Sequence, residues 1–222
     1  MIHYNYSPVQ LEEKAMALLR EFDSDRLEKP KSIDVYAVIE QLLGVEYDWK
    51  YLTPDQSVWG MTFFKPGYCW VWPESHYKPG MLTKKAFYEQ GTILIDSFLT
   101  ELPDRGPENF TVMHEVFHQV LHKRCFKHSN GDYRHETKKT NLSLQAGRKY
   151  RTSLEICESQ ANFCAACFLM PKEPVTAMFV KMVSSKASSN IPDDAIQDMA
   201  NEFSVSKSAM RIRLQTLGLV ER

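Results

Sequence analysis

The stretch Asn109-Phe-Thr-Val-Met-His114-Glu115-Val-Phe-His118 decides how this chain is interpreted, because it contains the pattern HExxH. On a helix, residues four apart lie on one face about one turn apart. The imidazoles of His114 and His118 can then reach one metal ion at about 2.0–2.1 Å. Glu115 projects in a different direction, which suits a general base that acts on a metal-bound water. The pattern predicts a metal-dependent hydrolase.

A motif of three fixed residues also occurs by chance, and two histidines on a surface helix are the alternative. The neighbours of the motif argue against a surface helix, because apolar side chains occupy several of its faces. They are Phe110, Val112, Met113, Val116, Phe117, Val120 and Leu121. A helix that is apolar nearly all round is buried. Because unpaired polar groups are costly in the interior, buried histidines and a buried glutamate favour a metal site.

A third ligand is expected on a second helix, because catalytic zinc usually takes three protein ligands. The segment Ser153–Met170 has helical character and ends before a proline, and it carries Glu155 and Glu158 among apolar residues. An ionised carboxylate there needs a cation. Asn162 follows Glu158 by one turn and could orient a ligand. Glu155 is the competing ligand, and the alternative to both is an ion pair with an arginine that precedes the helix.

Two further sets of potential ligands are interpreted as structural. His122 lies one turn beyond His118, and three successive turns of a straight helix cannot all converge on one ion. We therefore expect His122 to pack in the interior or to orient a ligand. Cys164 and Cys167 form a CxxC pattern, but no second CxxC exists and the pair sits in mid-helix. Buried packing cysteines are the favoured interpretation.

Length and composition describe an ordinary globular protein of one or two domains. The chain has 222 residues, 43% of them hydrophobic and 25% charged, and a formal net charge of −1. This charge gives no global basic field for nucleic acid. No apolar run approaches the roughly 20 residues of a membrane span, and the first residues lack the pattern of a signal peptide. Five cysteines, an odd number, do not suggest a disulfide framework, so we expect a cytoplasmic protein.

The remaining patterns predict an α+β fold with a small sheet among helices. A first helix is predicted over Pro8–Phe22, and a second is capped by Ser32 and ended by Gly44. Strands are predicted as a hairpin and a single strand, namely Val58–Phe64 with Tyr68–Trp72, and Thr92–Asp96. The metal-binding motif lies in a predicted helix over Pro107–Lys123. A polar excursion without clear periodicity follows, over Arg124–Tyr150.

The C-terminal part predicts helices again, with one helical stretch after Pro174 and a further pair over Pro192–Phe203 and Ser206–Leu217. We divide the chain into a metallopeptidase domain, residues 1–183, and a helix-turn-helix-like segment, residues 184–222. Three basic residues of this segment could contact phosphate, namely Lys207, Arg211 and Arg213. Nearby acidic residues offset their charge, so packing is favoured over direct nucleic-acid binding through residues 192–217.

Two blocks of this sequence resemble the ImmA/IrrE family of metallo-endopeptidases. The segment from Phe110 to His122 is similar to the family pattern FTxxHExxHxxxH, and the segment from Glu158 to Pro171 is similar to ExxANxFAxxLLMP. The resemblance covers roughly residues 8–180. The chain departs from the pattern at Val116-Phe117, Cys164 and Phe168, which leaves every presumed ligand in place.

The resemblance implies a zincin-like peptidase fold of the gluzincin kind, with zinc (Zn²⁺) on His114, His118 and Glu158 and with Glu115 as base. It also implies a cytoplasmic regulatory protease, often associated with phages or mobile elements or with stress responses. The implied substrate is a helix-turn-helix repressor. The alternative function is a regulatory module that binds a repressor or DNA and has a metal site but little peptidase activity.

Two features of substrate handling are expected from position alone. The strand at Thr92–Asp96 could pair with an extended substrate chain. An additional donor to the oxyanion is expected from the polar excursion. Its candidates are His128, Tyr133, His135 and Tyr150.

Overall fold

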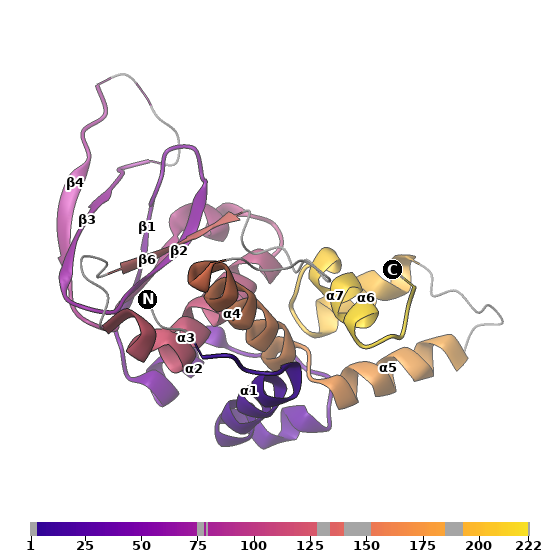
Figure 1. The fold of residues 1–222 in the computed structure, drawn as a ribbon. Helices are drawn as coiled ribbons and strands as arrows, with labels where there is room; N and C mark the ends of the chain where they lie inside the picture. Colours follow the sequence, from indigo (N-terminus) through magenta and orange to yellow (C-terminus); the bar gives the residue numbers. More distant parts are fainter. Residues whose placement is uncertain are drawn as a thin grey trace.

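The computed structural model describes residues 4–74, 78, 80–127, 134–139, 152–184 and 193–221. These residues form the α+β fold predicted from the sequence, with a small mixed sheet beside a group of helices (Figure 1). The helices are α1 (Pro8–Asp23), α2 (Val35–Val38), α3 (Gly106–Lys127), α4 (Ser153–Leu169), α5 (Lys172–Ser184), α6 (Asp193–Glu202) and α7 (Lys207–Thr216). The strands are β1 (Tyr47–Lys50), β2 (Val58–Phe63), β3 (Gly67–Val71), β4 (Lys84–Tyr88), β5 (Ile93–Asp96) and β6 (Arg134–Lys138).

The main sheet has the strand order β1-β5-β2-β6, with β1 parallel to β5 and the other neighbours antiparallel. The predicted strand at Thr92–Asp96 is present as β5. Ile93 and Ile95 belong to the core shared with the helices, whereas Leu94 packs with β3 on the opposite face. A strand that is covered on both faces is apolar at successive positions, which explains the sequence of β5.

The expectation that β5 pairs with a substrate chain is wrong, because β1 and β2 already occupy both of its edges. The predicted hairpin is wrong as well. β2 pairs with β5 and β6, whereas β3 pairs with β4. Cys69 and Val71 of β3 are buried against Met61 and Leu94 of the main sheet. β3 therefore stacks on a face of the sheet that contains β2 and does not extend it.

The N-terminal helices follow the prediction with one correction. Ser7 and Gln10 form a capping box at the start of α1. Asp34, and not Ser32, caps the second helix, because its carboxylate accepts hydrogen bonds from the first amides of α2. This helix continues as a π-turn over Ile39–Leu43 and ends, as predicted, at Gly44, whose φ of 58° is left-handed.

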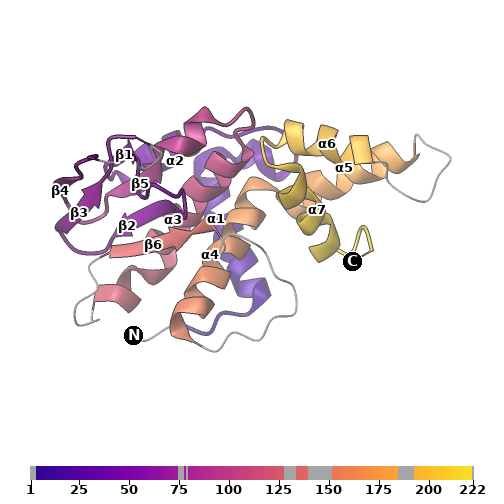
Figure 2. The same ribbon diagram turned by 90° about the horizontal axis from the view of Figure 1, so that it is seen from above.

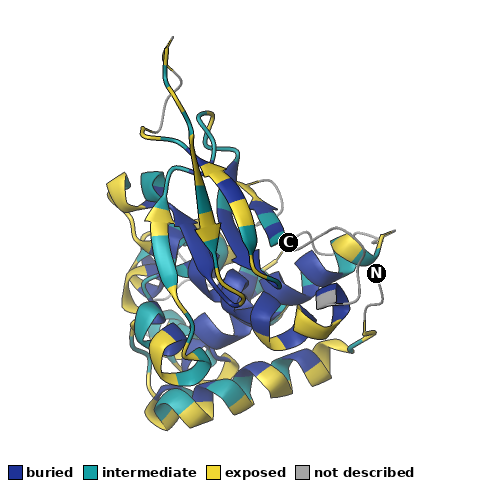
Figure 3. Cartoon of the chain, turned by 90° about the vertical axis from the view of Figure 1, so that its left-hand side faces the viewer, coloured by how far each residue is buried: buried dark blue, intermediate teal, exposed yellow. Residues whose placement is uncertain are grey.

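The two helices that carry the metal motif lie in the interior. α3 packs on the main sheet, and α4 packs against both α3 and α1 (Figures 1 and 2). Figure 3 shows buried residues in the helices and in the strands next to them, where β2 and β5 lie almost wholly buried, whereas β1, β3 and β4 have mostly intermediate and exposed residues. Within the described residues, no single helix has the length and apolar composition of a membrane span. α4 and α5 have that length and composition only when they are taken together, and a bend of 58° separates the two helices.

The carboxyl end of α4 is held by two buried arginines. Arg26 donates to the carbonyl oxygens of Phe168 (3.1 Å) and Leu169 (3.0 Å). Arg213 of α7 donates to Met170 O at 2.9 Å. The last carbonyls of a helix have no partner within the helix. The arginines therefore satisfy these groups and fix the end of the helix that carries Glu158.

The turn between α6 and α7 packs on the start of α3. The Asn109 side-chain amide donates to Ser204 O at 2.8 Å. A Cβ atom at Gly106 would lie only 2.9 Å from Ser206 Cα, so only glycine permits this approach. Apolar residues of α6 and α7 belong to the same core as α3 and α4, among them Met199 and Leu214. The C-terminal pair thus contacts both helices of the metal motif.

The three basic residues considered for phosphate contact all bind protein groups. Arg213 is buried and also donates to Glu12 Oε1 at 3.0 Å. Lys207 and Arg211 both form ion pairs with Asp193. These contacts hold the two helices to each other and to the rest of the protein.

The predicted polar excursion over Arg124–Tyr150 contains regular structure where it is described. α3 continues to Lys127, beyond its predicted end at Lys123, and β6 forms an edge of the main sheet. Along β6, His135 and Thr137 are buried while Arg134, Glu136 and Lys138 are not. This alternation is that of a strand with one covered face.

Candidate metal centre

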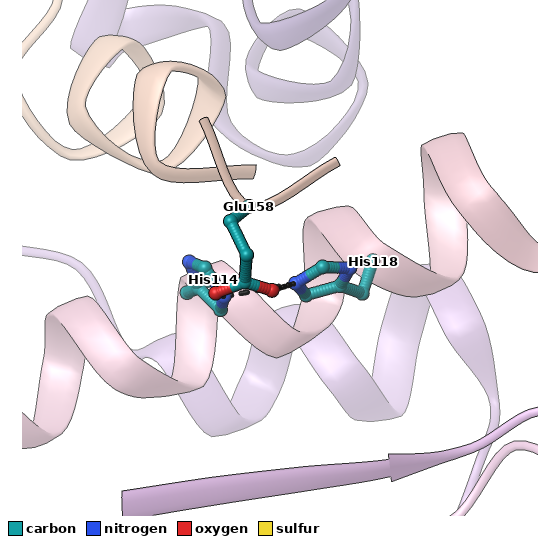
Figure 4. Close-up of side chains that lie close together, drawn as sticks. All are labelled: His114, His118 and Glu158. Atoms are coloured by element: carbon teal, nitrogen blue, oxygen red, sulfur yellow. Dashed lines mark hydrogen bonds and ion pairs between the residues drawn. The ribbon is translucent and has the colours of Figure 1, made fainter. Parts of the chain in front are cut away.

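The structure brings His114, His118 and Glu158 together in the interior. Figure 4 shows the two imidazoles on α3 and the carboxylate reaching them from α4. One ligand atom from each residue lies within 4.8 Å of the others, and all three residues are buried. The two Nε2 atoms are 2.9 Å apart. Glu158 Oε1 is 3.0 Å from His118 Nε2, and Glu158 Oε2 is 3.6 Å from His114 Nε2.

Asn162 sets the tautomer of His114. The Nδ1 atom of His114 lies 2.9 Å from Asn162 Oδ1, which can only accept a hydrogen bond. The proton of the neutral ring is therefore on Nδ1, and the lone pair of Nε2 points toward Glu158. Asn162 lies where a group that orients a ligand was expected.

A chain of hydrogen bonds sets the tautomer of His118. Gln160 donates its amide to Tyr4 O at 2.7 Å, so its Oε1 accepts from His122 Nε2 at 3.0 Å. The Nδ1 atom of neutral His122 is then an acceptor. It lies 3.1 Å from His118 Nδ1, which must donate. His118 therefore also carries its lone pair on Nε2, and His122 supports a ligand as the sequence suggested.

With these tautomers, His114 Nε2, His118 Nε2 and the Glu158 carboxylate face one another, and none of them carries a hydrogen. Two ligands at about 2.05 Å from one tetrahedral ion lie roughly 3.3 Å apart. The separation of 2.9 Å between the two Nε2 atoms and that of 3.6 Å between His114 Nε2 and Glu158 Oε2 bracket that value. Glu158 Oε2 has no hydrogen-bond partner among the described residues. The donor set, two imidazoles and a carboxylate, therefore fits a divalent cation such as zinc.

The electrostatics of the site keep the ligands in their metal-binding forms. Burial, together with neighbouring imidazoles, lowers the pKa of His114 and of His118 to about 3. Burial alone would raise the pKa of Glu158, but the ionised carboxylate accepts a hydrogen bond from His135, and its pKa lies well below the ordinary value. Both histidines are therefore neutral and Glu158 is ionised, as metal binding requires.

Glu115 lies beside the ligands, against the main sheet. It is fully buried, and neither carboxylate oxygen has a hydrogen-bond partner of ordinary geometry among the described residues. Burial raises its pKa well above the ordinary value. The nearby Thr137 hydroxyl opposes this effect and the charge of Glu158 adds to it. A buried carboxyl group without partners is costly, so its presence here indicates a functional role.

Gly60 of β2 makes room for Glu115. A Cβ atom at Gly60 would overlap Glu115 Oε1 and would lie 3.0 Å from its Cδ and Cγ. The pairing of β2 with β6 is irregular between Val58 and Gly60, and Gly60 faces Thr137 across the pair. Glycine inside a strand often marks the close approach of another group, and here that group is the proposed base.

We expect Gly60→Ala to displace the Glu115 carboxyl while leaving the metal ligands in place. Cleavage of a protein substrate should fall about 100-fold, the effect of a misplacement of about 1 Å. Zinc content, measured by elemental analysis, should stay near that of the parent. Met61→Leu is the control, because Met61 packs on the opposite face of the sheet. Unchanged cleavage by Gly60→Ala would show that the position of Glu115 is not critical.

Comparison with known families agrees with this geometry. Residues 98–215, slightly more than half of the chain, match the profile of the family Peptidase_M78, described as the IrrE N-terminal-like domain. The chain belongs to this family. The matched range contains α3, β6 and α4 and continues into α7. A search of curated proteins gave no significant match.

The resemblance to the ImmA/IrrE family is thereby confirmed, and the structure separates the two candidate glutamates. Glu155 forms a capping box with Thr152 at the start of α4, where the two residues exchange hydrogen bonds of 3.0 and 3.1 Å. It is not in the group that could hold a metal, whereas Glu158 is. Cys164 and Cys167 are buried free thiols, as predicted for packing cysteines.

Of the four residues considered as donors to the oxyanion, the structure describes only His135. His135 lies against the ligands and hydrogen-bonds Glu158 Oε1. His128, Tyr133 and Tyr150 lie outside the described residues. The sequence patterns missed Gly60, Thr137 and Gln160. Gly60 could have been found from the rule that glycine inside a strand marks a close approach.

Proposed function

We propose that this chain is a zinc-dependent endopeptidase whose substrate is a helix-turn-helix transcriptional repressor, in regulation linked to phages, mobile elements or stress. The observation that carries the peptidase proposal is the set of His114, His118 and Glu158 with Glu115 buried beside it, whose carboxylate has no hydrogen-bond partner of ordinary geometry among the described residues. Membership of a peptidase family supports the same chemistry. The repressor as substrate rests on the ImmA/IrrE resemblance.

Each residue of the site has a distinct part in the proposed hydrolysis. When bound, zinc supplies a Lewis acid that polarises a carbonyl group and acidifies a water molecule. Asn162 and His122 orient the two histidines through Nδ1. Glu115 takes a proton from the attacking water and later delivers it to the leaving amine. Burial raises the pKa of Glu115 above its ordinary value, which makes the carboxylate a stronger base.

An extended substrate could bind along β6. This strand is at the end of the main sheet in its described part, and it pairs with β2 on one side. Its buried residues His135 and Thr137 face Glu158 and Glu115. An edge strand offers backbone groups for β-augmentation. In this proposal β6, and not β5, pairs with the extended substrate chain.

The direct test is to incubate the purified, zinc-loaded protein with the repressor encoded nearest to its gene. We expect defined fragments by intact-mass spectrometry, and none after removal of the metal by a chelator. If zinc-loaded protein binds the repressor and leaves it intact, the alternative of a regulatory module with little peptidase activity is supported instead.

A further inference from the structure

His135 occupies a position on β6 from which it reaches a metal ligand. It pairs with Thr62 across β2 and β6, and its side chain is buried. Its Nε2 atom hydrogen-bonds Glu158 Oε1, and its ring centroid lies 4.5 Å from that of His118. A histidine on the sheet therefore contacts a carboxylate that comes from the helix on the other side of the site.

The two oxygens of Glu158 have different surroundings. An ionised carboxylate only accepts hydrogen bonds, so His135 donates its Nε2–H to Oε1. His118 Nε2 is also near Oε1, at 3.0 Å, but it carries a lone pair and brings no hydrogen. Oε2 has no hydrogen-bond partner among the described residues. One oxygen is thus held from the sheet and the other is left for a cation.

His135 is not placed as a ligand itself. The ligand atoms that lie within 4.8 Å of one another come from His114, His118 and Glu158, and the group does not include His135. Its Nε2–H is directed at Oε1, which leaves no lone pair on that atom for a metal.

We propose that His135 is a positioning residue for Glu158, which holds Oε1 so that the carboxylate offers the metal only Oε2. The proposal rests on the proposed function only in taking Glu158 as a ligand. Catalytic zinc needs a position that is left open for water. A carboxylate that bound through both oxygens would fill it, so the hydrogen bond from β6 keeps the site open.

The test uses the full chain loaded with cobalt(II) in place of zinc, because the visible absorption of cobalt(II) responds to its coordination number. Three variants are compared with the parent. His135→Leu removes the donor, His135→Gln restores an N–H group near the position of Nε2, and Glu136→Gln is the control on the outward face of β6. Zinc affinity is measured by competition with a chelator.

We expect His135→Leu to lower the intensity of the cobalt(II) absorption, as coordination number rises, and to weaken zinc binding about 10- to 100-fold. His135→Gln should recover most of both properties, and Glu136→Gln should match the parent. The proposal is overturned if His135→Leu keeps the parental spectrum and affinity, or if His135→Gln is as impaired as His135→Leu. A parent that binds one metal but cleaves nothing would contradict the proposed function and leave this inference standing.

Discussion

Glu115→Gln is expected to lower the rate of substrate cleavage by about 100- to 10,000-fold, the usual contribution of general acid–base catalysis. The amide keeps the size of the carboxylate but cannot accept a proton. Glu115 is not among the residues that could hold the metal, so the variant should bind zinc in the parental amount. Removing a buried carboxyl group without partners should also leave the fold intact. Single-turnover cleavage and elemental analysis of the same sample measure both effects.

Glu155→Gln is the matched control for this variant, because it makes the same chemical change on α4 away from the metal group. It should cleave at the parental rate. Relief of the repressor should also be measured for Glu115→Gln. If that variant relieves repression as well as the parent does, proteolysis is not the function, and the protein acts by binding its repressor.

The metal-bearing helices were predictable because their signals are local and periodic. His114 and His118 share a helix face by spacing alone, and the apolar residues around them indicated burial. α3 and α4 form as expected, and their ligands meet. Glu158 could not be separated from Glu155 by spacing, because both lie on the same side of one helix. The capping box that engages Glu155 follows the pattern of a Thr three residues before a Glu at a helix start.

The sheet side of the site was harder to predict. β6 has the sequence Arg-His-Glu-Thr-Lys, which is polar on both faces. Strands are normally detected from alternating apolar residues. The buried face of β6 is polar because it lies against Glu158 and Glu115. The same polar residues remove the apolar alternation from which a strand would have been predicted. Similarly, β3 follows β2 closely in sequence but stacks on the sheet, which local patterns do not reveal.

Replacing each glutamate of α4 by alanine should distinguish their roles, because only one of the two variants is expected to lose zinc. Glu158→Ala should reduce bound zinc from one ion per chain to almost none in elemental analysis of protein purified without chelators, because two imidazoles alone remain. Glu155→Ala should keep the zinc. It should instead lower the melting temperature modestly, because Thr152 still caps the helix and only the hydrogen bond from Thr152 N to the Glu155 side chain is lost, a contribution of about 1 kcal/mol.

The structural reason for this contrast is the different surroundings of the two side chains. Glu158 is buried, its pKa is held well below the ordinary value, and one of its oxygens has no hydrogen-bond partner among the described residues. Glu155 is only partly buried and bonds Thr152 through Oε2. If Glu155→Ala loses the zinc and Glu158→Ala retains it, the third ligand is Glu155. In that case the geometry of the candidate metal centre, including the contact from His135, would not be that of the metal-bound protein.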